Sequence, residues 1–234
     1  MRLHRFFGNF DLRKERFAVS DRELINQWRN VLRFEIGSEL VLCDGKLNEA
    51  LARIISFDKN SAEIEILGIS KNESEPKRSV ALYVSILKGE HAEIVAEKAT
   101  EIGVSEIVPI ISERTVKQSV RPERLLKVIR EAAEQSGRGV IPTLHEPLPL
   151  MLALRQASVY DTNFFLHYSG DDISNFAGKN FHTAGVFVGP EGGWTGAEIA
   201  LAKKSDFKIV TLGNLTLRAE TAAIVGVYSV LRMM

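Results

Sequence analysis

The sequence predicts an α/β protein in two parts, a small N-terminal β-barrel followed by a mostly parallel sheet with helices on both faces. Three observations predict it. Short apolar runs around a hairpin signal fill the chain before residue 70. After residue 80, strand-like and helix-like segments alternate, which is typical of a parallel sheet. Near the C-terminus, two apolar runs each stop at glycine and are followed by the start of a helix.

Length and composition limit the class of protein. The chain has 234 residues and 45% hydrophobic content, enough for one large or two small globular domains. No apolar run approaches the ~20 residues that cross a bilayer, and the start MRLHRFF lacks the apolar core of a signal peptide. Cys43 is the only cysteine, and the histidines have no metal-ligand spacing. We therefore expect a cytoplasmic protein with no membrane segment and no metal.

The first part reads as a barrel with one helix. Ser20 and Glu23 have the spacing of a capping box, which predicts a helix through Leu24, Trp28, Val31 and Leu32 that ends before Gly37. Asp44-Gly45 is a hairpin signal between strands. The polar stretch Lys71–Ser79 contains Pro76 and predicts a boundary that gives domains 1–73 and 74–234. The predicted strands are Glu39–Cys43, Ala50–Phe57 and Ala62–Leu67.

The second part alternates strands with helices. Gly103 is placed to stop the first helix, and Pro122 stands in the first turn of the second. The predicted strands are Val80–Leu87, Glu106–Ile111, Asn163–Tyr168, Gly185–Gly189 and Lys208–Leu212, and the predicted helices are Glu90–Ile102, Pro122–Gln135, one from Ala197 and one from about Ala219 to Arg232.

Two glycine-centred stretches, Val186–Ile199 and Val210–Ala223, predict one ligand pocket at the carboxyl ends of two strands. Thr195 with Glu198 forms a capping box for the helix after the first stretch. Glu191 lies inside the loop with no lysine beside it, and neither phosphate-loop spacing is present. A ligand with ribose hydroxyls, an adenine edge or a positive centre fits better than a phosphate.

Several polar residues have both a structural and a functional interpretation. Arg218 and Glu220 stand next to the predicted pocket, which favours a functional role over a surface arginine and a helix-start acid. His167 ends a strand, where packing is the commoner role, and Trp194 could cover a ligand or pack. Ser136, in the tract Glu134–Arg138, lacks a nucleophile elbow, so this tract reads as a helix C-cap.

Charge is distributed unevenly although the net charge is zero. Residues 1–33 carry eight Lys/Arg against four acids, and residues 114–138 carry seven against three. These two segments are candidate nucleic-acid surfaces, or otherwise solvated helix faces.

Four segments resemble, in order and spacing, the motifs of the ribosomal RNA small subunit methyltransferase E family: the run from Lys88 to Val116, EAAEQSGR, FVGPEGGWTGAEI and LGNLTLRAETA. The first 70 or so residues also resemble the family's PUA-like RNA-binding barrel. The resemblance implies a SPOUT-class enzyme that moves a methyl group from S-adenosylmethionine to N3 of a uridine in small-subunit (16S) ribosomal RNA, with the assembling or assembled subunit as partner. It further implies a trefoil knot and a homodimer with active sites at the interface.

The resemblance also assigns residues. For the catalytic pair our hypothesis is Arg218 and Glu220: Arg218 stabilises charge on the uracil or holds the adjacent phosphate, and Glu220 orients Arg218 or relays the proton. The implied cofactor residues are Leu166, His167, Gly189, Pro190, Glu191, Gly192, Gly193, Leu212, Gly213, Asn214, Leu217, Arg218 and Thr221. The expected RNA contacts, from the two basic segments, are Arg2, Arg5, Arg13, Arg16, Arg114, Lys117, Arg121 and Arg138.

The sequence departs from the family pattern at a few positions. Leu215 stands where the family usually has an arginine, and Asn26 and Gln27 replace histidines of the barrel helix. Leu215 favours one alternative, a non-catalytic RNA-binding assembly factor, whereas the intact glycine motifs disfavour it. A nucleotide hydrolase is disfavoured by Glu191 and the missing lysine.

Overall fold

The computed structural model describes residues 3–116 and 119–233, and these fall into two compact units. Unit 1 holds the described residues up to Glu75 together with Ala133–Val140, and unit 2 holds Pro76–Ala132 and the residues from Ile141 onward. The second segment of unit 1 is far from the first in the sequence. The boundary between residues 73 and 74 that the sequence predicts stays a prediction.

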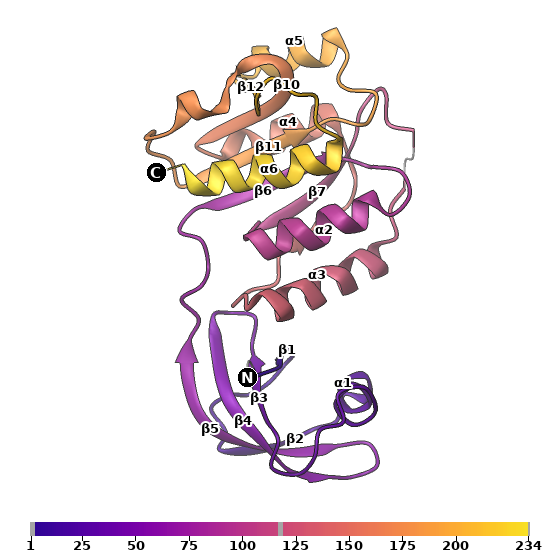
Figure 1. Cartoon of the computed structure of the whole chain (residues 1–234), viewed down its shortest axis with the longest axis vertical. Helices are drawn as coiled ribbons and strands as arrows, with labels where there is room; N and C mark the ends of the chain where they lie inside the picture. Colours follow the sequence, from indigo (N-terminus) through magenta and orange to yellow (C-terminus); the bar gives the residue numbers. More distant parts are fainter. Residues whose placement is uncertain (1–2, 117–118, 234) are drawn as a thin grey trace. The chain divides into compact units, whose positions relative to one another are not determined.

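Unit 1 is built on a five-stranded sheet in the order β1-β3-β4-β5-β2 (Figure 1). β1 pairs with β3 in parallel, and the remaining pairs are antiparallel. The long strands β4 and β5 join over most of their lengths, with two register shifts that bend the sheet. The strands are β1 (Arg5–Phe7), β2 (Arg16–Val19), β3 (Glu39–Cys43), β4 (Asn48–Phe57) and β5 (Ala62–Lys71).

The predicted hairpin between β3 and β4 is confirmed. Asp44 stabilises its turn, because Oδ1 accepts hydrogen bonds from the backbone N–H groups of Lys46 at 2.7 Å and Asn48 at 3.1 Å. β1 and β2 were not predicted, because strands of only three and four residues leave no periodic pattern in the sequence.

The helix of unit 1 begins one residue later than the capping box predicts. Asp21, and not Ser20, is the N-cap: its Oδ1 accepts from the N–H groups of Glu23 and Leu24. Aspartate and serine cap helices about equally well, but the charge of Asp21 also interacts favourably with the positive end of the helix dipole. The helix α1 (Arg22–Asn26) continues as a π-helical turn η1 (Gln27–Val31). The wider winding leaves Trp28 fully buried and Val31 66% exposed, so Val31 is not the core residue that a regular helix predicts.

Unit 2 contains a sheet in the order β12-β10-β11-β6-β7-β8, with β9 also pairing with β7. Every pairing in it is parallel, which confirms the predicted architecture. The strands are β6 (Ser79–Ser85), β7 (Glu106–Ile111), β8 (Thr143–Leu144), β9 (Leu148–Pro149), β10 (Thr162–Asp172), β11 (Thr183–Val188) and β12 (Lys208–Thr211).

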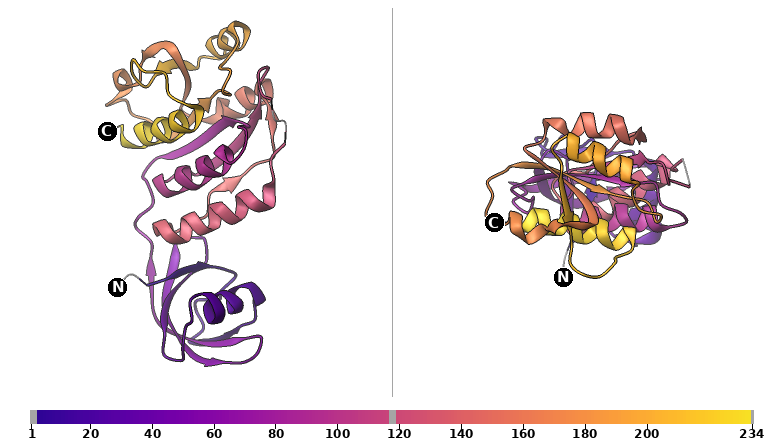
Figure 2. Two further views of the ribbon diagram at one scale, coloured as in Figure 1. Left: turned by 45° about the vertical axis from the view of Figure 1, so that its right-hand side comes forward. Right: turned by 90° about the horizontal axis from the view of Figure 1, so that it is seen from above.

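Helices cover both faces of this sheet (Figure 2). Alternate residues of β6 point to opposite faces, so Leu82 packs in one core with α2 and α6, and Tyr83 packs in another with α4 and α5. The sequence prediction did not include α4 and placed the other helices within a residue or two. The helices are α2 (His91–Ile102), α3 (Pro122–Ser136), α4 (Leu150–Gln156), α5 (Gly196–Lys204) and α6 (Ala219–Arg232), with short 3-10 turns η2 (Ala157–Val159) and η3 (Ile173–Phe176).

The last helix lies unusually close to the sheet. A Cβ on Gly226 of α6 would stand 2.8 Å from Cδ1 of Leu166 on β10 and 3.3 Å from Cγ1 of Val186 on β11, so a larger residue would push these side chains aside. The helix packs on β11 and β6, and its first turn lies at the cavity described below. The trefoil knot that the resemblance implies stays a prediction. Within the described ranges, none of the helices combines the length and the apolar character that crossing a membrane requires.

Candidate functional site

A cavity of about 550 Å³ lies at the carboxyl ends of β10, β11 and β12. The loop after β11 and the loop after β12 form two of its walls, as the glycine-bounded strand ends predict. β10 contributes Leu166, His167 and Tyr168, and α2 contributes His91. A volume of this size is typical of sites for small molecules and cofactors.

The loop after β11 is anchored at its far end by the predicted capping box, which is confirmed. The Thr195 hydroxyl accepts from the N–H of Glu198, and the Glu198 carboxylate accepts from the N–H of Thr195 at 2.8 Å. The other oxygen of Glu198 accepts from the N–H of Glu113 at 2.9 Å, so this buried carboxylate also ties the loop to the segment after β7. Gly193 adopts a φ of +67°, in the left-handed region that favours glycine.

Trp194 is a packing residue that also borders the cavity. Its ring stacks on Phe165 at 4.3 Å and its Nε1 donates to the carbonyl of Leu166 at 3.0 Å. A Cβ on Gly189 would approach this ring to 3.0 Å. The indole is therefore fixed from two sides, and it sets the distance between β10 and the glycine loop.

Glu191 carries its negative charge toward the cavity. Its Oε1 accepts from the N–H of Lys88, just before α2, at 3.0 Å. Burial alone would raise the pKa of Glu191, but this hydrogen bond and the nearby charges of Lys88 and His91 outweigh burial and hold the pKa below its ordinary value. The carboxylate is therefore ionised at neutral pH and can attract a cation.

Glu220, in the first turn of α6, lies between two cationic or protonatable side chains. Its Oε1 is 3.3 Å from Nδ1 of His91 and 4.0 Å from Nη1 of Arg218. The Glu220 side chain is only 16% exposed, whereas that of Arg218 is 83% exposed. Glu220 is thus a fixed acceptor, and Arg218 reaches from it over the cavity.

His167, on β10, is the second histidine that lines the cavity. The hydroxyl of Ser169 lies 2.8 Å from its Nδ1, and the backbone N–H of Ser169 also donates to this nitrogen. Burial, followed by the charge of Lys203, holds the pKa of His167 below its ordinary value. The neutral ring therefore carries its proton on Nε2.

The structure brings most of the predicted pocket residues together. Both implied catalytic residues border the cavity, as do Leu166, His167, Gly189, Pro190, Glu191, Gly193, Leu212, Leu217 and Arg218. Gly192, Gly213, Asn214 and Thr221 belong to the same loops and helix turn but do not line it. Sequence reasoning missed His91 and Tyr168. Only the parallel order of the strands brings the start of α2 to this edge, and nothing local in the sequence indicates it.

The predicted RNA contacts divide into exposed, engaged and buried residues. Arg13 is 91% exposed, and Arg16 and Arg121 keep more than half of their side chains in solvent while lying near acids. Arg114 donates to the carbonyl of Gly192 at 2.8 Å and so braces the glycine loop. Arg2 and Lys117 lie outside the described residues.

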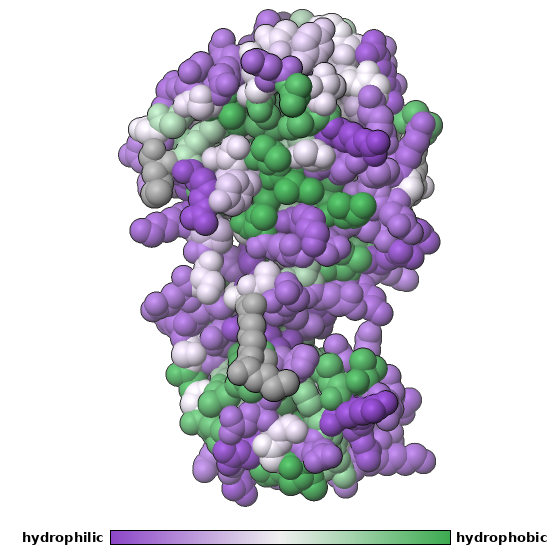
Figure 3. Space-filling view, viewed as in Figure 1, coloured by the Kyte–Doolittle hydropathy of each residue, from purple (hydrophilic) through white to green (hydrophobic). Residues whose placement is uncertain are grey.

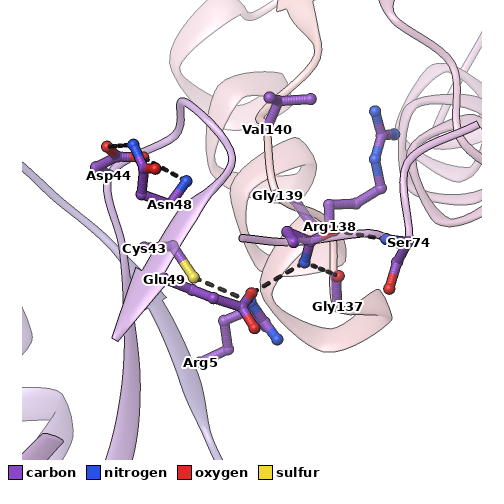
Figure 4. A network of polar contacts seen from close by, with 12 residues as sticks. Arg5, Cys43, Asp44, Asn48, Glu49, Ser74, Gly137, Arg138, Gly139 and Val140 are labelled. Carbon is purple, nitrogen blue, oxygen red and sulfur yellow. Dashed lines mark hydrogen bonds and ion pairs between the residues drawn. The ribbon is translucent and has the colours of Figure 1, made fainter. Parts of the chain in front are cut away.

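Arg5 and Arg138 are corrections to the predicted RNA surface. Within unit 1, Arg5 forms an ion pair with Glu49 and also reaches Sγ of Cys43 (Figure 4). Arg138 is 5% exposed and is paired with Glu75. Both guanidinium groups are largely buried and are paired with partly buried carboxylates, so neither is available to a phosphate. The surplus of positive charge counted from the sequence therefore overstates the accessible basic surface.

The cavity suits a ligand with an apolar ring and a positive centre. Leu166, Val188, Leu212 and Leu217 supply an apolar wall, and Glu191 and Glu220 supply negative charge. Backbone groups of two loops face the same space. This chemistry is that of an adenosyl group joined to a cation rather than that of a phosphate.

Comparison with known proteins agrees with this assignment of the ligand chemistry. Residues 73–231 match the family described as an RNA methyltransferase domain, and residues 29–67 match the RNA methyltransferase PUA domain. The ribosomal RNA small subunit methyltransferase E of Mesomycoplasma hyopneumoniae is 33% identical over 95% of this chain and 96% of its own length. The chain belongs to the ribosomal RNA small subunit methyltransferase E family.

Other members of the family are similar over nearly all of the chain. The Rickettsia conorii small subunit methyltransferase E is 29% identical over 98% of this chain and 96% of its own length. The crystal structure of the Neisseria gonorrhoeae family member, bound to S-adenosyl methionine, superposes with a TM-score of 0.87 at 29% identity, covering 97% of this chain and 95% of that one. A Legionella pneumophila structure in complex with the cofactor SAM gives a TM-score of 0.88 at 29% identity, covering 99% and 98% of the two chains.

These matches confirm the predicted fold class, a SPOUT-type mostly parallel α/β sheet with an N-terminal PUA-like domain. Methyltransferase E members therefore share with this chain the arrangement that forms the cavity. Among residues 3–116 and 119–233, no three His, Cys, Asp or Glu side chains are grouped so that they could hold a metal ion.

Proposed function

We propose that this protein transfers a methyl group from S-adenosylmethionine to N3 of a specific uridine in small-subunit ribosomal RNA. The observation that carries the proposal is the cavity at the ends of β10, β11 and β12, with ionised Glu191 on one wall and Arg218 over its mouth. Family membership supports the reaction class. The site of action follows from the substrate, so we also propose a cytoplasmic location.

The residues present fit the methyl donor. The apolar wall around Leu166 and Leu212 suits the adenine ring, and the backbone of the two loops can hydrogen-bond ring and ribose atoms. Glu191 and Glu220 suit the positive sulfur. The bound donor would supply an electrophilic methyl group, and the protein would supply position and charge. We propose that Gly192, Gly213, Asn214 and Thr221 support the loops from behind the cavity surface.

The nucleophile decides what else the site must do. N3 of uridine lies on the Watson-Crick edge, so the target base must be unpaired or turned out of a helix before it can enter the cavity. When N3 loses its proton, negative charge spreads over the uracil oxygens. We propose that the exposed guanidinium of Arg218 stabilises this charge, and that Glu220 holds Arg218 in place from 4.0 Å.

RNA would be held outside the cavity as well. We propose that the PUA-like unit binds the RNA and that Arg13, Arg16, Arg114 and Arg121 contact its phosphates. Contacts of this kind release counterions, so affinity should fall steeply with salt. The net charge of zero favours the assembling or assembled subunit, rather than naked RNA, as the substrate.

We further propose that the protein acts as a homodimer. Hydrophobic side chains gather over α2 and α6 on the surface of unit 2 (Figure 3). Ile94 of α2 and Val225 and Tyr228 of α6 are between 38% and 50% exposed, although all three are large and apolar. An apolar face beside the cavity suits a second copy of this chain, because the copy would then also close the site. Light scattering of the purified protein tests this, and replacing Tyr228 with glutamate should yield monomers.

The decisive experiment is mass mapping of modified nucleosides in ribosomal RNA. Cells that lack the protein should lose one N3-methyluridine from small-subunit RNA, and the intact gene should restore it. Loss of a different modification, or of none, would refute the substrate assignment. The Arg155→Ala variant, altered at an exposed residue of α4 on the other face of the sheet, should restore the modification fully.

A second candidate function is a non-catalytic ribosome-assembly factor. The observation that favours it is Leu215, which is 83% exposed at the cavity where the family resemblance expects an arginine. Such a factor has no need of the methyl donor. Calorimetry with S-adenosylmethionine separates the two functions, because only the enzyme should bind it.

A further inference from the structure

His91 is a polar group of the cavity to which the reaction outlined above assigns no role. It is the first residue of α2, and it reaches the cavity from an element that contributes nothing else to the lining. Its Nδ1 is buried and lies 3.3 Å from Oε1 of Glu220. In the part of the chain that the structure describes, Nδ1 forms no hydrogen bond, so the carboxylate of Glu220 acts on it as a neighbouring negative charge.

The partner of Nδ1 decides which ring nitrogen can accept a proton. A carboxylate accepts hydrogen bonds and attracts the positive end of an N–H group, so its position 3.3 Å from Nδ1 favours the neutral tautomer with the proton on Nδ1. Nε2 of His91 is then the acceptor. This is the arrangement in which a carboxylate fixes the tautomer of a histidine that works as a general base.

The second histidine of the cavity has the opposite arrangement. Nδ1 of His167 accepts the backbone N–H of Ser169, so its neutral ring keeps the proton on Nε2. The N–H of Ser169 can only donate, so Nδ1 of His167 must act as an acceptor. His167 therefore has no free acceptor nitrogen for a proton from a ligand, and of the two histidines only His91 can take one.

Charges around His91 come from three elements. Glu220 and Arg218 face it from the start of α6, Glu191 from the glycine loop, and Lys88 from the turn that precedes α2. Glu220 thus stands between the guanidinium of Arg218 and the imidazole of His91. The Glu220 carboxylate can therefore position two groups: Arg218, the cation for the uracil oxygens, and His91, a base for the uracil nitrogen.

We propose that His91 is the general base that removes the N3 proton of the target uridine, with Glu220 as its positioning residue. The proposal rests on the proposed function. Nε2 takes the proton from N3, and the electron pair left on N3 forms the bond to the methyl carbon as the bond from that carbon to sulfur breaks. The positive charge of the sulfonium ends on the imidazolium, which later releases its proton to water.

Single-turnover methyl transfer tests the proposal. The wild type and the His91→Ala variant are compared on small subunits reconstituted with RNA that contains either uridine or 5-fluorouridine. Fluorine at C5 makes N3–H more acidic, so a missing base matters less. At neutral pH, His91→Ala should transfer methyl on the order of 10²-fold more slowly to uridine. The deficit should shrink at least tenfold on 5-fluorouridine, and added imidazole should restore part of the rate.

The controls separate a chemical role from a structural one. Affinity for S-adenosylmethionine, measured by calorimetry, should stay within twofold of the wild type in His91→Ala, which also shows that the cavity is folded. His182→Ala, at an exposed histidine before β11, should leave every rate unchanged. The logarithm of the His91→Ala rate should rise with pH with unit slope, since hydroxide then removes the proton.

Three results carry distinct meanings. A rate within threefold of the wild type on uridine would overturn the role of His91. A large deficit that is equal on both RNAs and insensitive to imidazole would also overturn it, because His91 would then only hold Glu220. A wild type that methylates a different atom, or nothing, would instead refute the proposed function.

Discussion

Arg138 and Glu75 form a buried two-pronged ion pair within unit 1, although 63 positions separate them in the sequence. Nε of Arg138 donates to Oε1 of Glu75 at 2.9 Å, and Nη2 lies 2.9 Å from Oε2. The same Oε1 accepts from the N–H of Gly139 at 2.8 Å. Beside it, Asn72 donates to the carbonyl of Gly137 and to Glu49, which joins this pair to the Arg5–Glu49 pair.

Removing Arg138 should destabilise the protein rather than weaken RNA binding alone. Arg138→Ala leaves the partly buried Glu75 carboxylate without its charged partner, although the N–H of Gly139 still donates to it, and this costs on the order of 2–3 kcal/mol of the free energy of unfolding. Urea denaturation measures this. Arg13→Ala, at a 91% exposed arginine, is the matched control and should change stability by less than about 0.5 kcal/mol. Equal stability of the two variants would contradict the importance of the pair.

The Glu49 carboxylate makes the stability of the protein depend on pH. Burial alone would raise the pKa of Glu49, but hydrogen bonds from Arg5 and Asn72 outweigh burial and lower it. The stabilisation is therefore present above the ordinary pKa of a glutamate and is lost as pH falls through the lower, folded value. The unfolding midpoint of the wild type should approach that of Glu49→Gln as pH falls from about 4.3, the ordinary pKa of a glutamate, toward about 2. A constant difference over this range would rule out the linkage.

Glu191 should favour the methyl donor over its product. The donor carries a positive sulfur and S-adenosylhomocysteine does not, so an ionised carboxylate in the cavity binds the former more tightly. In Glu191→Gln, calorimetry should show weaker donor binding on the order of 3- to 10-fold, with product binding nearly unchanged. The wild-type preference for the donor should shrink accordingly. If donor and product lose affinity equally, Glu191 acts on the loop and not on the charge.

Arg218→Ala should slow methyl transfer without loss of donor binding. A guanidinium that meets charge developing in the transition state contributes on the order of 10²–10³ in rate. The expected result is a fall of that size in the single-turnover rate constant, with donor affinity within twofold of the wild type. Arg155→Ala is the control. A wild-type rate in Arg218→Ala would exclude this residue from catalysis.

The regular elements could be predicted from the sequence because their signals are local. Glu39–Cys43 and Glu106–Ile111 are strands with the predicted bounds, and Thr195 with Glu198 caps α5 as its spacing predicts. The one failed cap, at Ser20, lost to the carboxylate of Asp21 one position later. Where two capping residues are adjacent, spacing alone does not select between them.

Contacts between distant residues could not be predicted in the same way. From the sequence, Arg5 and Arg138 were predicted to be surface charges. Their partners Glu49 and Glu75 are 44 and 63 positions away, so no local pattern indicates the ion pairs. His91 read as one scattered histidine because its partner Glu220 belongs to another helix. In both cases the chemistry depends on tertiary packing, which hydrophobic periodicity does not encode.

The composition of unit 1 from two separate stretches has a consequence for biosynthesis. As the polypeptide leaves the ribosome, the strands up to Lys71 emerge first, but Glu134, which accepts from the N–H of Phe7, and Arg138 emerge only after Pro76–Ala132. Until then, Glu75 of the nascent barrel lacks Arg138, the partner of its ion pair. Gene fusions or truncations that separate residues 3–75 from 133–140 should accordingly yield an N-terminal fragment that is prone to proteolysis.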